Sequence, residues 1–351
     1  MNKLILIVLF FLSLFLTSCQ TDTTWSKAGF YHWQTNFSLS NLEHAYLDSL
    51  HIHKLYIKFF DVDWDANRQQ AVPSAELIWN TKLLEQIEII PTVFITNRTL
   101  TNTTEGKVEE LADKIYQKIN ELVAGKEFFE FQIDCDWTKS TKEKYLLLLQ
   151  RLRELSPNQQ LSATIRLHQV KFQEDTGIPP VDRGMLMYYN IGDINDWQSE
   201  NSIYEPILAE PYLARMKKYP LELDIVLPLF HWGLIYRDKK LFKIINNLGS
   251  LDLEDKERFD QTADNRYEVV KATYLKGHYL YEGDKIRLES INEEQLYTAS
   301  QQLMQSLPNK ERTIAFYHLD EVILRNWEMT MLVNILKQHQ VSQLSTKGSQ
   351  D

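Results

Sequence analysis

The stretch "FQIDCDWTKS" (residues 131–140) places two carboxylates, Asp134 and Asp136, one residue apart within an apolar run. Successive side chains of a β-strand point to opposite faces, so both aspartates lie on one face if this stretch is extended. The remaining side chains sort into two sets: Gln132 and Thr138 with the aspartates, and Phe131, Ile133, Cys135 and Trp137 opposite. The alternation predicts a strand that is buried on one side. Its polar side is either an edge in water or the lining of a site.

Seven other apolar runs have the same character, and together they predict an α/β fold. Strands are predicted at 28–34, 54–64, 88–97, 128–137, 160–170, 184–192, 223–233 and 313–322. Helical periodicity separates several of them, at 40–50, 107–125, 141–155 and 326–339. Strands that alternate with helices indicate parallel crossovers, and eight such units favour a closed (β/α)8 TIM barrel over an open sheet.

We expect the barrel to span residues 28–340 and to carry a small α+β insertion at about 237–311, between strands seven and eight. That segment contains "YEVVKATYLKGHYLYEGDKIRLESI" (267–291), which resembles short strands more than a helix. The segment between strands five and six is too short for a full helix.

The N-terminal residues have the features of a secretory signal. Lys3 precedes an apolar run that ends at Leu16, and "LTSC" follows, which resembles the lipobox of bacterial lipoproteins. We therefore predict a signal peptide at 1–18, lipidation of Cys19, a tether at 19–27 and a disordered tail at 341–351. The expected location is the cell envelope, with the lipid in a membrane, most simply the outer membrane, and the protein facing the periplasm or the surface.

The net charge, the cysteines and the absence of certain motifs limit the classes of partner and cofactor expected for this chain. The formal net charge of the 351 residues is -10 and there is no long basic run, which argues against a nucleic-acid partner. Cys135 would be the one free thiol after lipidation of Cys19, and it lies on the face opposite the aspartates. No glycine-rich phosphate loop, GxSxG elbow, HExxH or paired-cysteine motif is present, so we predict no cofactor and no metal.

The carboxyl ends of the predicted strands carry polar, ionisable or aromatic groups, and in a barrel these ends surround the mouth where chemistry takes place. On strand five, Arg166 lies on a polar face and needs partners, because an unpaired buried charge is very costly. Asp134 and Asp136 on the neighbouring strand are the natural candidates. The same groups could form a purely structural ion-pair network or could contact a ligand. The other candidate ligand contacts are His32, Trp33, Asp61, Asp63, His168, Tyr189, Asn190, His231, Trp232 and His318.

Two of these segments resemble the family 18 glycoside hydrolases, which include chitinases and endo-β-N-acetylglucosaminidases. Asp134 and Asp136 match the last two aspartates of the family's D-x-x-D-x-D-x-E strand, and Tyr189 and Asn190 match its Met-x-Tyr-Asp/Asn strand. The resemblance implies that Asp136 orients a substrate acetamido group, which attacks in place of an enzyme nucleophile. The position of the family's general acid is occupied by Thr138, which is not a useful proton donor near neutral pH.

Over most of the chain the sequence also resembles a group of bacterial secreted lipoproteins without an assigned activity. The shared stretches are "QIDCDWT" (132–138), "LSATIRLHQVK" (161–171), "PPVDRGMLMYYN" (179–190) and "LDIVLPLFHWG" (223–233). This resemblance implies a fold and a location rather than a reaction.

Two hypotheses remain open. In the first, a lipid-anchored barrel binds a glycan and hydrolyses it, with Asp134 and Asp136 in the site and the missing acid supplied by Glu321, Asp320 or Asp63. In the second, the barrel is a non-catalytic carbohydrate-binding or assembly lipoprotein. Both predict a glycan ligand, and neither names a protein partner.

Overall fold

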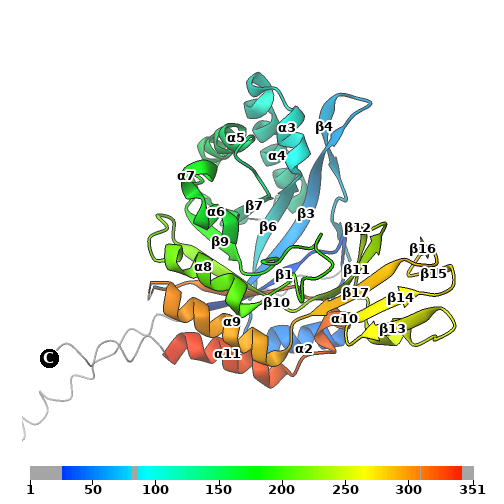
Figure 1. Cartoon of the computed structure of the whole chain (residues 1–351). Coiled ribbons are helices and arrows are strands. Elements are labelled where there is room, and N and C mark those ends of the chain that lie inside the picture. The colour runs from blue at the N-terminus through cyan, green and yellow to red at the C-terminus, as the bar shows by residue number, and fades with distance from the viewer. Residues whose placement is uncertain (1–25, 81–85, 126, 309, 342–351) are drawn as a thin grey trace, which may run out of the picture.

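The computed structural model describes residues 26–80, 86–125, 127–308 and 310–341 (Figure 1). The predicted signal peptide, Cys19, most of the tether and nearly all of the tail lie outside the described residues. No helix within the described part of the chain combines the length and the apolar character needed to cross a membrane.

Eight parallel strands close into a barrel, as the sequence predicted. Their order is β1-β18-β10-β9-β8-β7-β6-β3, and pairing of β1 with β3 closes the ring. The strands are β1 (Lys27–His32), β3 (Lys54–Asp65), β6 (Glu88–Ile95), β7 (Glu130–Cys135), β8 (Gln160–Arg166), β9 (Arg183–Met187), β10 (Leu223–Pro228) and β18 (Thr313–Tyr317).

Helices cover the outside of the barrel (Figure 1). Ser40 caps the first of them in a capping box with Glu43, the spacing predicted from the sequence. The helices are α2 (Asn41–Ser49), α3 (Asn97–Asn102), α4 (Val108–Val123), α5 (Lys142–Leu155), α6 (Leu167–Lys171), α7 (Gln173–Thr176), α8 (Pro206–Met216), α9 (Glu293–Ser306), α10 (Glu321–Leu324) and α11 (Met329–Val341), with 3-10 turns η1 (Glu105–Lys107) and η2 (Ser250–Leu253).

Strand five is shorter than the sequence predicted, because the chain turns into α6 directly after Arg166. The backbone N–H of Arg166 donates to the side-chain oxygen of Gln169, 2.7 Å away, and this hydrogen bond stabilises the start of the helix. His168 is therefore a helical residue and not part of the polar strand face.

The strand predicted at 223–233 is two strands. β10 ends at Pro228, which lacks an N–H to donate to a neighbouring strand, and a new strand, β11, starts at His231. β11 belongs to a second, antiparallel sheet of order β12-β11-β17-β14-β13. Its strands are β11 (His231–Arg237), β12 (Lys240–Asn246), β13 (Phe259–Ala263), β14 (Arg266–Val269) and β17 (Lys285–Ser290).

Short strand pairs complete the structure. The hairpin of β15 (Thr273–Leu275) and β16 (His278–Leu280) packs beside the second sheet, and together they enclose a small apolar core of their own. Near the barrel mouth, β4 (Gln70–Ser74) pairs antiparallel with the last residues of β3. β2 (Asn36–Phe37) pairs with β5 (Ile78–Trp79).

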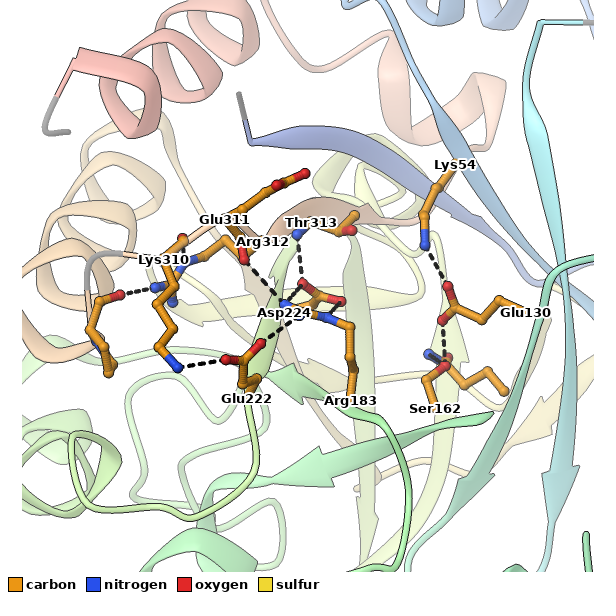
Figure 2. Close-up of polar contacts among 12 residues, drawn as sticks. Lys54, Glu130, Ser162, Arg183, Glu222, Asp224, Lys310, Glu311, Arg312 and Thr313 are labelled. Atoms are coloured by element: carbon orange, nitrogen blue, oxygen red, sulfur yellow. Dashed lines mark hydrogen bonds and ion pairs between the residues drawn. The ribbon is translucent and has the colours of Figure 1, made fainter. Parts of the chain in front are cut away.

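Ion pairs and hydrogen bonds link strands at the amino-terminal end of the barrel (Figure 2). Lys54 pairs with the buried carboxylate of Glu130, and the hydroxyl of Ser162 donates to Glu130 Oε1 at 2.6 Å. Arg183 donates twice to Asp224, at 2.8 and 3.0 Å. These contacts join residues near the amino-terminal ends of β3, β7 and β8 on one side and of β9 and β10 on the other, and so stabilise this end of the barrel.

Candidate functional site

A cavity of about 230 Å³ lies at the carboxyl ends of the barrel strands. It combines two carboxylates, a guanidinium, two imidazoles and several aromatic rings. The lining residues are Trp33, Phe94, Asp134, Asp136, Arg166, Met187, Tyr189, Asn190, Phe230, His231, Trp232, Asn246, Asn247, Tyr317 and His318.

Asp134 is the buried carboxylate of this cavity, with 4% of its surface exposed. The hydroxyl of Thr164 donates to its Oδ1 at 2.6 Å. Burial raises the pKa of Asp134 to about 6; Arg166 opposes the shift, and the nearby carboxylate of Asp136 adds to it. Asp134 is therefore a carboxyl group that exchanges a proton near neutral pH.

Asp136 lies further out and forms the predicted ion pair with Arg166. Nε of Arg166 is 2.6 Å from Oδ1 and Nη2 is 3.2 Å from Oδ2, so the guanidinium makes two contacts with one carboxylate. The guanidinium also lies 5.8 Å from the ring centre of Tyr189. The aspartate, arginine and tyrosine predicted from strands four, five and six thus meet in one place.

Aromatic rings form the walls of the cavity. The ring of Tyr317 is 5.8 Å from Trp33 and 5.5 Å from Tyr189. Phe230 lies 5.5 Å from Tyr189 and 5.0 Å from Trp232. These rings surround the acidic pair with flat apolar surface, while the tyrosine hydroxyls and the indoles add polar edges.

The second sheet supplies one side of the cavity, through His231, Trp232, Asn246 and Asn247. The indole N–H of Trp232 donates to Glu289 Oε2 at 2.7 Å, and Glu289 is held by Arg287 Nη2, 2.8 Å from Oε1. Both members of this ion pair are fully buried. The orientation of Trp232 in the cavity is thus set by a strand, β17, far along the chain.

Two histidines lie at the carboxyl ends of β1 and β18. His318 lines the cavity, whereas His32 is buried beside it, edge-on to Phe37 at 4.8 Å. Burial lowers the pKa of His32 to about 4, and the nearby His318 lowers it further, whereas Asp320 opposes the shift. Burial also lowers the pKa of His318. Both rings are therefore neutral at physiological pH.

The structure keeps the three carboxylates considered as alternative acids out of the cavity. Both Nε and Nη2 of Arg98 pair with Asp63, which holds the pKa of that carboxyl far below its usual range. Asp320 caps α10 by accepting from the backbone N–H of Val322 at 2.8 Å, and its other oxygen accepts from Gln34 at 2.5 Å.

Glu321 points to the surface and pairs with Arg325, the residue that directly follows α10. It does not line the cavity. The expected proton donor is thus not provided by Asp63, Asp320 or Glu321 in this arrangement.

Asp61 and His168, two further predicted ligand contacts, do not line the cavity, and neither does Thr138, which matches the general-acid position of the family that the sequence resembles. Asp61 pairs with Lys58 at 3.1 Å. His168 is exposed on α6, and Thr138 is exposed at the rim, where its hydroxyl is 2.9 Å from that of Ser140. Trp137, by contrast, lies on the helix side as predicted, stacked on Tyr145 at 4.5 Å.

Sequence reasoning missed Phe94, Met187, Phe230, Tyr317, Asn246 and Asn247 as cavity residues. A signal for one of them was present: Phe94 pairs in register with Asp134, so the alternation that turned the aspartate inward also turns Phe94 inward. The two asparagines had no such signal, because they reach the cavity only through the fold of the second sheet.

Among the described residues, no cluster of three or more histidine, cysteine, aspartate or glutamate side chains is arranged to hold a metal ion. The cavity offers a carboxyl proton, a paired guanidinium and aromatic faces. These are groups that bind a polar, ring-shaped ligand through hydrogen bonds and stacking.

The fold and the cavity together define a TIM barrel with an antiparallel sheet inserted after its seventh strand, and this architecture has known counterparts. The spore cortex-lytic enzymes SleL of Bacillus cereus and Bacillus megaterium QM B1551 each superpose with a TM-score of 0.51, at 13% and 11% identity. Each comparison covers 90% of this chain and 74% of the other. A chitinase from Chromobacterium violaceum ATCC 12472 superposes with a TM-score of 0.48 at 10% identity, over 91% of this chain and 99% of that one.

The two SleL similarities confirm the barrel expected from the sequence, and at such identities they show the fold alone. No sequence model of a known family matches the chain, and no curated protein matches it.

Proposed function

We propose that the mouth of this barrel binds a glycan. The observation that carries the proposal is the cavity itself, in which the Asp136–Arg166 pair and Asp134 lie among the rings of Trp33, Tyr189 and Trp232. Carboxylates and a guanidinium bind sugar hydroxyl groups, and aromatic faces stack on the apolar faces of sugar rings. The barrel fold that the chain shares with the spore cortex-lytic enzymes SleL is compatible with this ligand class.

Hydrolysis in the same cavity is the second candidate function, and one observation favours it. Asp134 has a pKa of about 6, so it can carry a proton near neutral pH as a general acid must. The residue at the family's acid position, Thr138, supports the opposite alternative, a barrel that binds without cleaving. The ion pair with Arg166 also supports binding alone, because it engages both oxygens of Asp136.

Calorimetric titration of the full-length chain with β-1,4-linked N-acetylglucosamine oligomers of two to six sugars tests the binding proposal. We expect binding in the wild type, and a loss of at least about tenfold in Trp232→Ala and in Asp136→Asn. Trp64→Ala is the matched control, because Trp64 lies where β3 pairs with β4 and does not line the cavity. Failure of the wild type to bind any oligomer, or unchanged binding in both cavity variants, would refute the proposal.

Product analysis of the same mixtures separates the two functions. New reducing ends that disappear in Asp134→Asn and Asp136→Asn establish a hydrolase. Saturable binding without new reducing ends establishes a non-catalytic carbohydrate-binding protein. Thermal unfolding of each variant shows that a lost signal reflects the site and not the fold.

We also propose that the chain is anchored to a membrane of the cell envelope through lipid on Cys19. The support is the apolar run and the lipobox-like "LTSC" at residues 16–19. Metabolic labelling with a radioactive fatty acid, followed by fractionation, tests this. Label in wild type and none in Cys19→Ala supports the anchor, and equal label in both refutes it.

A further inference from the structure

Four aromatic side chains stand exposed beside the second sheet. Their exposed fractions are 70% for Tyr274, 54% for Tyr281, 48% for Phe242 and 43% for Tyr279. The ring of Tyr279 is 5.0 Å from that of Tyr274 and 5.2 Å from that of Tyr281. We call these four residues the aromatic row. Contiguous aromatic surface of this kind on a folded domain is a mark of a binding site.

One ion pair supports two of the rings of the row; its carboxylate is buried and its guanidinium is about 25% exposed. The guanidinium of Arg237 lies 3.9 Å from the ring centre of Phe242 and 4.4 Å from that of Tyr281. Asp284, which is buried, accepts from Arg237 at 2.7 and 2.9 Å and from the backbone N–H of Tyr281 at 2.8 Å. Rings that are fixed before binding lose little conformational entropy when a ligand covers them.

The second sheet connects the row to the barrel cavity in two ways. Strand β11 begins at His231, which lines the cavity, and ends at Arg237, which supports the row, a separation of about 20 Å for an extended strand. The turn of the β15–β16 hairpin returns toward the cavity: Lys276 pairs with Asp252 at 3.1 Å, and both charges act on the pKa of His231.

The chemistry of the row matches a glycan better than a protein core. Three of its four rings carry hydroxyl groups, and the charge of Arg237 beneath them is neutralised by Asp284. The surface thus offers flat apolar faces with hydroxyl edges and little net charge, which suits neutral sugar rings with their apolar faces and hydroxyl rims.

We propose that the aromatic row is a second glycan-binding surface, on which an extended chain rests while its end occupies the barrel cavity. The proposal rests on the function proposed for the cavity and adds that the ligand is an oligosaccharide long enough to span cavity and row. Engagement of both sites by one chain makes affinity depend on chain length.

The test uses the full-length chain and two probes, the β-1,4-linked dimer and hexamer of N-acetylglucosamine. In the double variant Tyr279→Ala/Tyr281→Ala, we expect the dissociation constant of the hexamer to rise about tenfold and that of the dimer to stay unchanged. Tyr297→Ala is the matched control, because Tyr297 is equally exposed, at 44%, on α9 outside the row.

The outcomes separate the two proposals. Equal hexamer binding by wild type and double variant overturns the aromatic row and leaves the cavity intact. Absence of binding of either probe to the wild type overturns both. A change of molecular mass in the double variant, measured by analytical ultracentrifugation without glycan, shows that the row holds a second copy of the chain, and so overturns the glycan assignment.

Discussion

Arg166 holds Asp136 by two contacts at the mouth of the barrel, with Nε 2.6 Å from Oδ1 and Nη2 3.2 Å from Oδ2. The pair joins β8 to the turn after β7 and stands beside the buried carboxyl of Asp134. The same pair can stabilise the barrel as an ion pair and can contact a ligand in the cavity.

In the wild type, the guanidinium of Arg166 opposes the effect of burial on the pKa of Asp134. Replacement of Arg166 by methionine should therefore raise this pKa further, above about 6. Glycan binding should weaken as well, since Asp136 loses its orientation. The carboxyl resonance of Asp134, followed by NMR against pH, measures the first effect and calorimetry the second. Arg166→Lys keeps the charge but not the two-point geometry, so it should restore the pKa more fully than the affinity. An unchanged titration in Arg166→Met would contradict this account.

Asp134 should make the folded state less stable as pH rises. Its pKa in the folded state is about 6, above the unfolded value, so the folded state binds more protons between these values. Relative to Asp134→Asn, the wild type should lose about 2–3 kcal/mol of unfolding free energy between pH 4 and pH 7. Urea unfolding at several pH values measures this difference, and Asp113→Asn, on the surface, is the control. Parallel pH profiles of wild type and Asp134→Asn would show that the carboxyl is not perturbed.

The buried pair of Arg287 and Glu289 should matter for both stability and binding. Glu289→Ala leaves a buried guanidinium without its carboxylate, so we expect a loss of about 3–5 kcal/mol in unfolding free energy. The double variant Arg287→Met/Glu289→Leu removes both charges and should recover much of that stability. It should not recover glycan affinity, because the indole N–H of Trp232 still lacks its acceptor. Recovery of full affinity in the double variant would show that Trp232 needs no such support.

His339 should limit the stability of the protein in acid. Burial lowers its pKa to about 3, and the ring Nε2 lies 2.9 Å from the hydroxyl of Ser300 on α9. Because the folded pKa lies below the unfolded one, the stabilisation is present above pH 6.5 and is lost as pH falls toward 3. Chemical unfolding should show wild type losing about 3 kcal/mol more than His339→Gln between pH 7 and pH 4. His53→Gln, at an exposed position, should follow the wild-type profile; identical profiles for His339→Gln would refute the prediction.

Much of the fold could be predicted from local patterns. The alternation in residues 131–137 placed Asp134 toward the bore and Trp137 toward the helices, and both placements are confirmed. Period-two patterns report the face of a strand because neighbouring side chains must point in opposite directions. The Arg166–Asp136 pair was predictable for a related reason, since a charge on an inward strand face needs a partner.

The errors arose where a strand changes into something else. The polar alternation in residues 160–168 continues past Arg166, but the backbone turns into a helix there and carries His168 to the surface. Residues 223–233 form one apolar run, yet the chain changes sheets after Pro228. Side-chain pattern alone does not contain these changes of direction, because they depend on which backbone groups find partners elsewhere.

The amino-acid sequence by itself determined the eight-strand barrel and the inward face of its central strands, because hydrophobic periodicity acts between residues that are close along the chain. Only the tertiary structure decided which charged groups share the cavity. Asp63 pairs with Arg98, Asp320 caps α10 and Glu321 pairs with Arg325, so none of these carboxylates lines the cavity. The second sheet, in contrast, brings Asn246 and Asn247 to the cavity. Pairings of this kind join residues distant in sequence, and their energies depend on separation and burial, which no local pattern records.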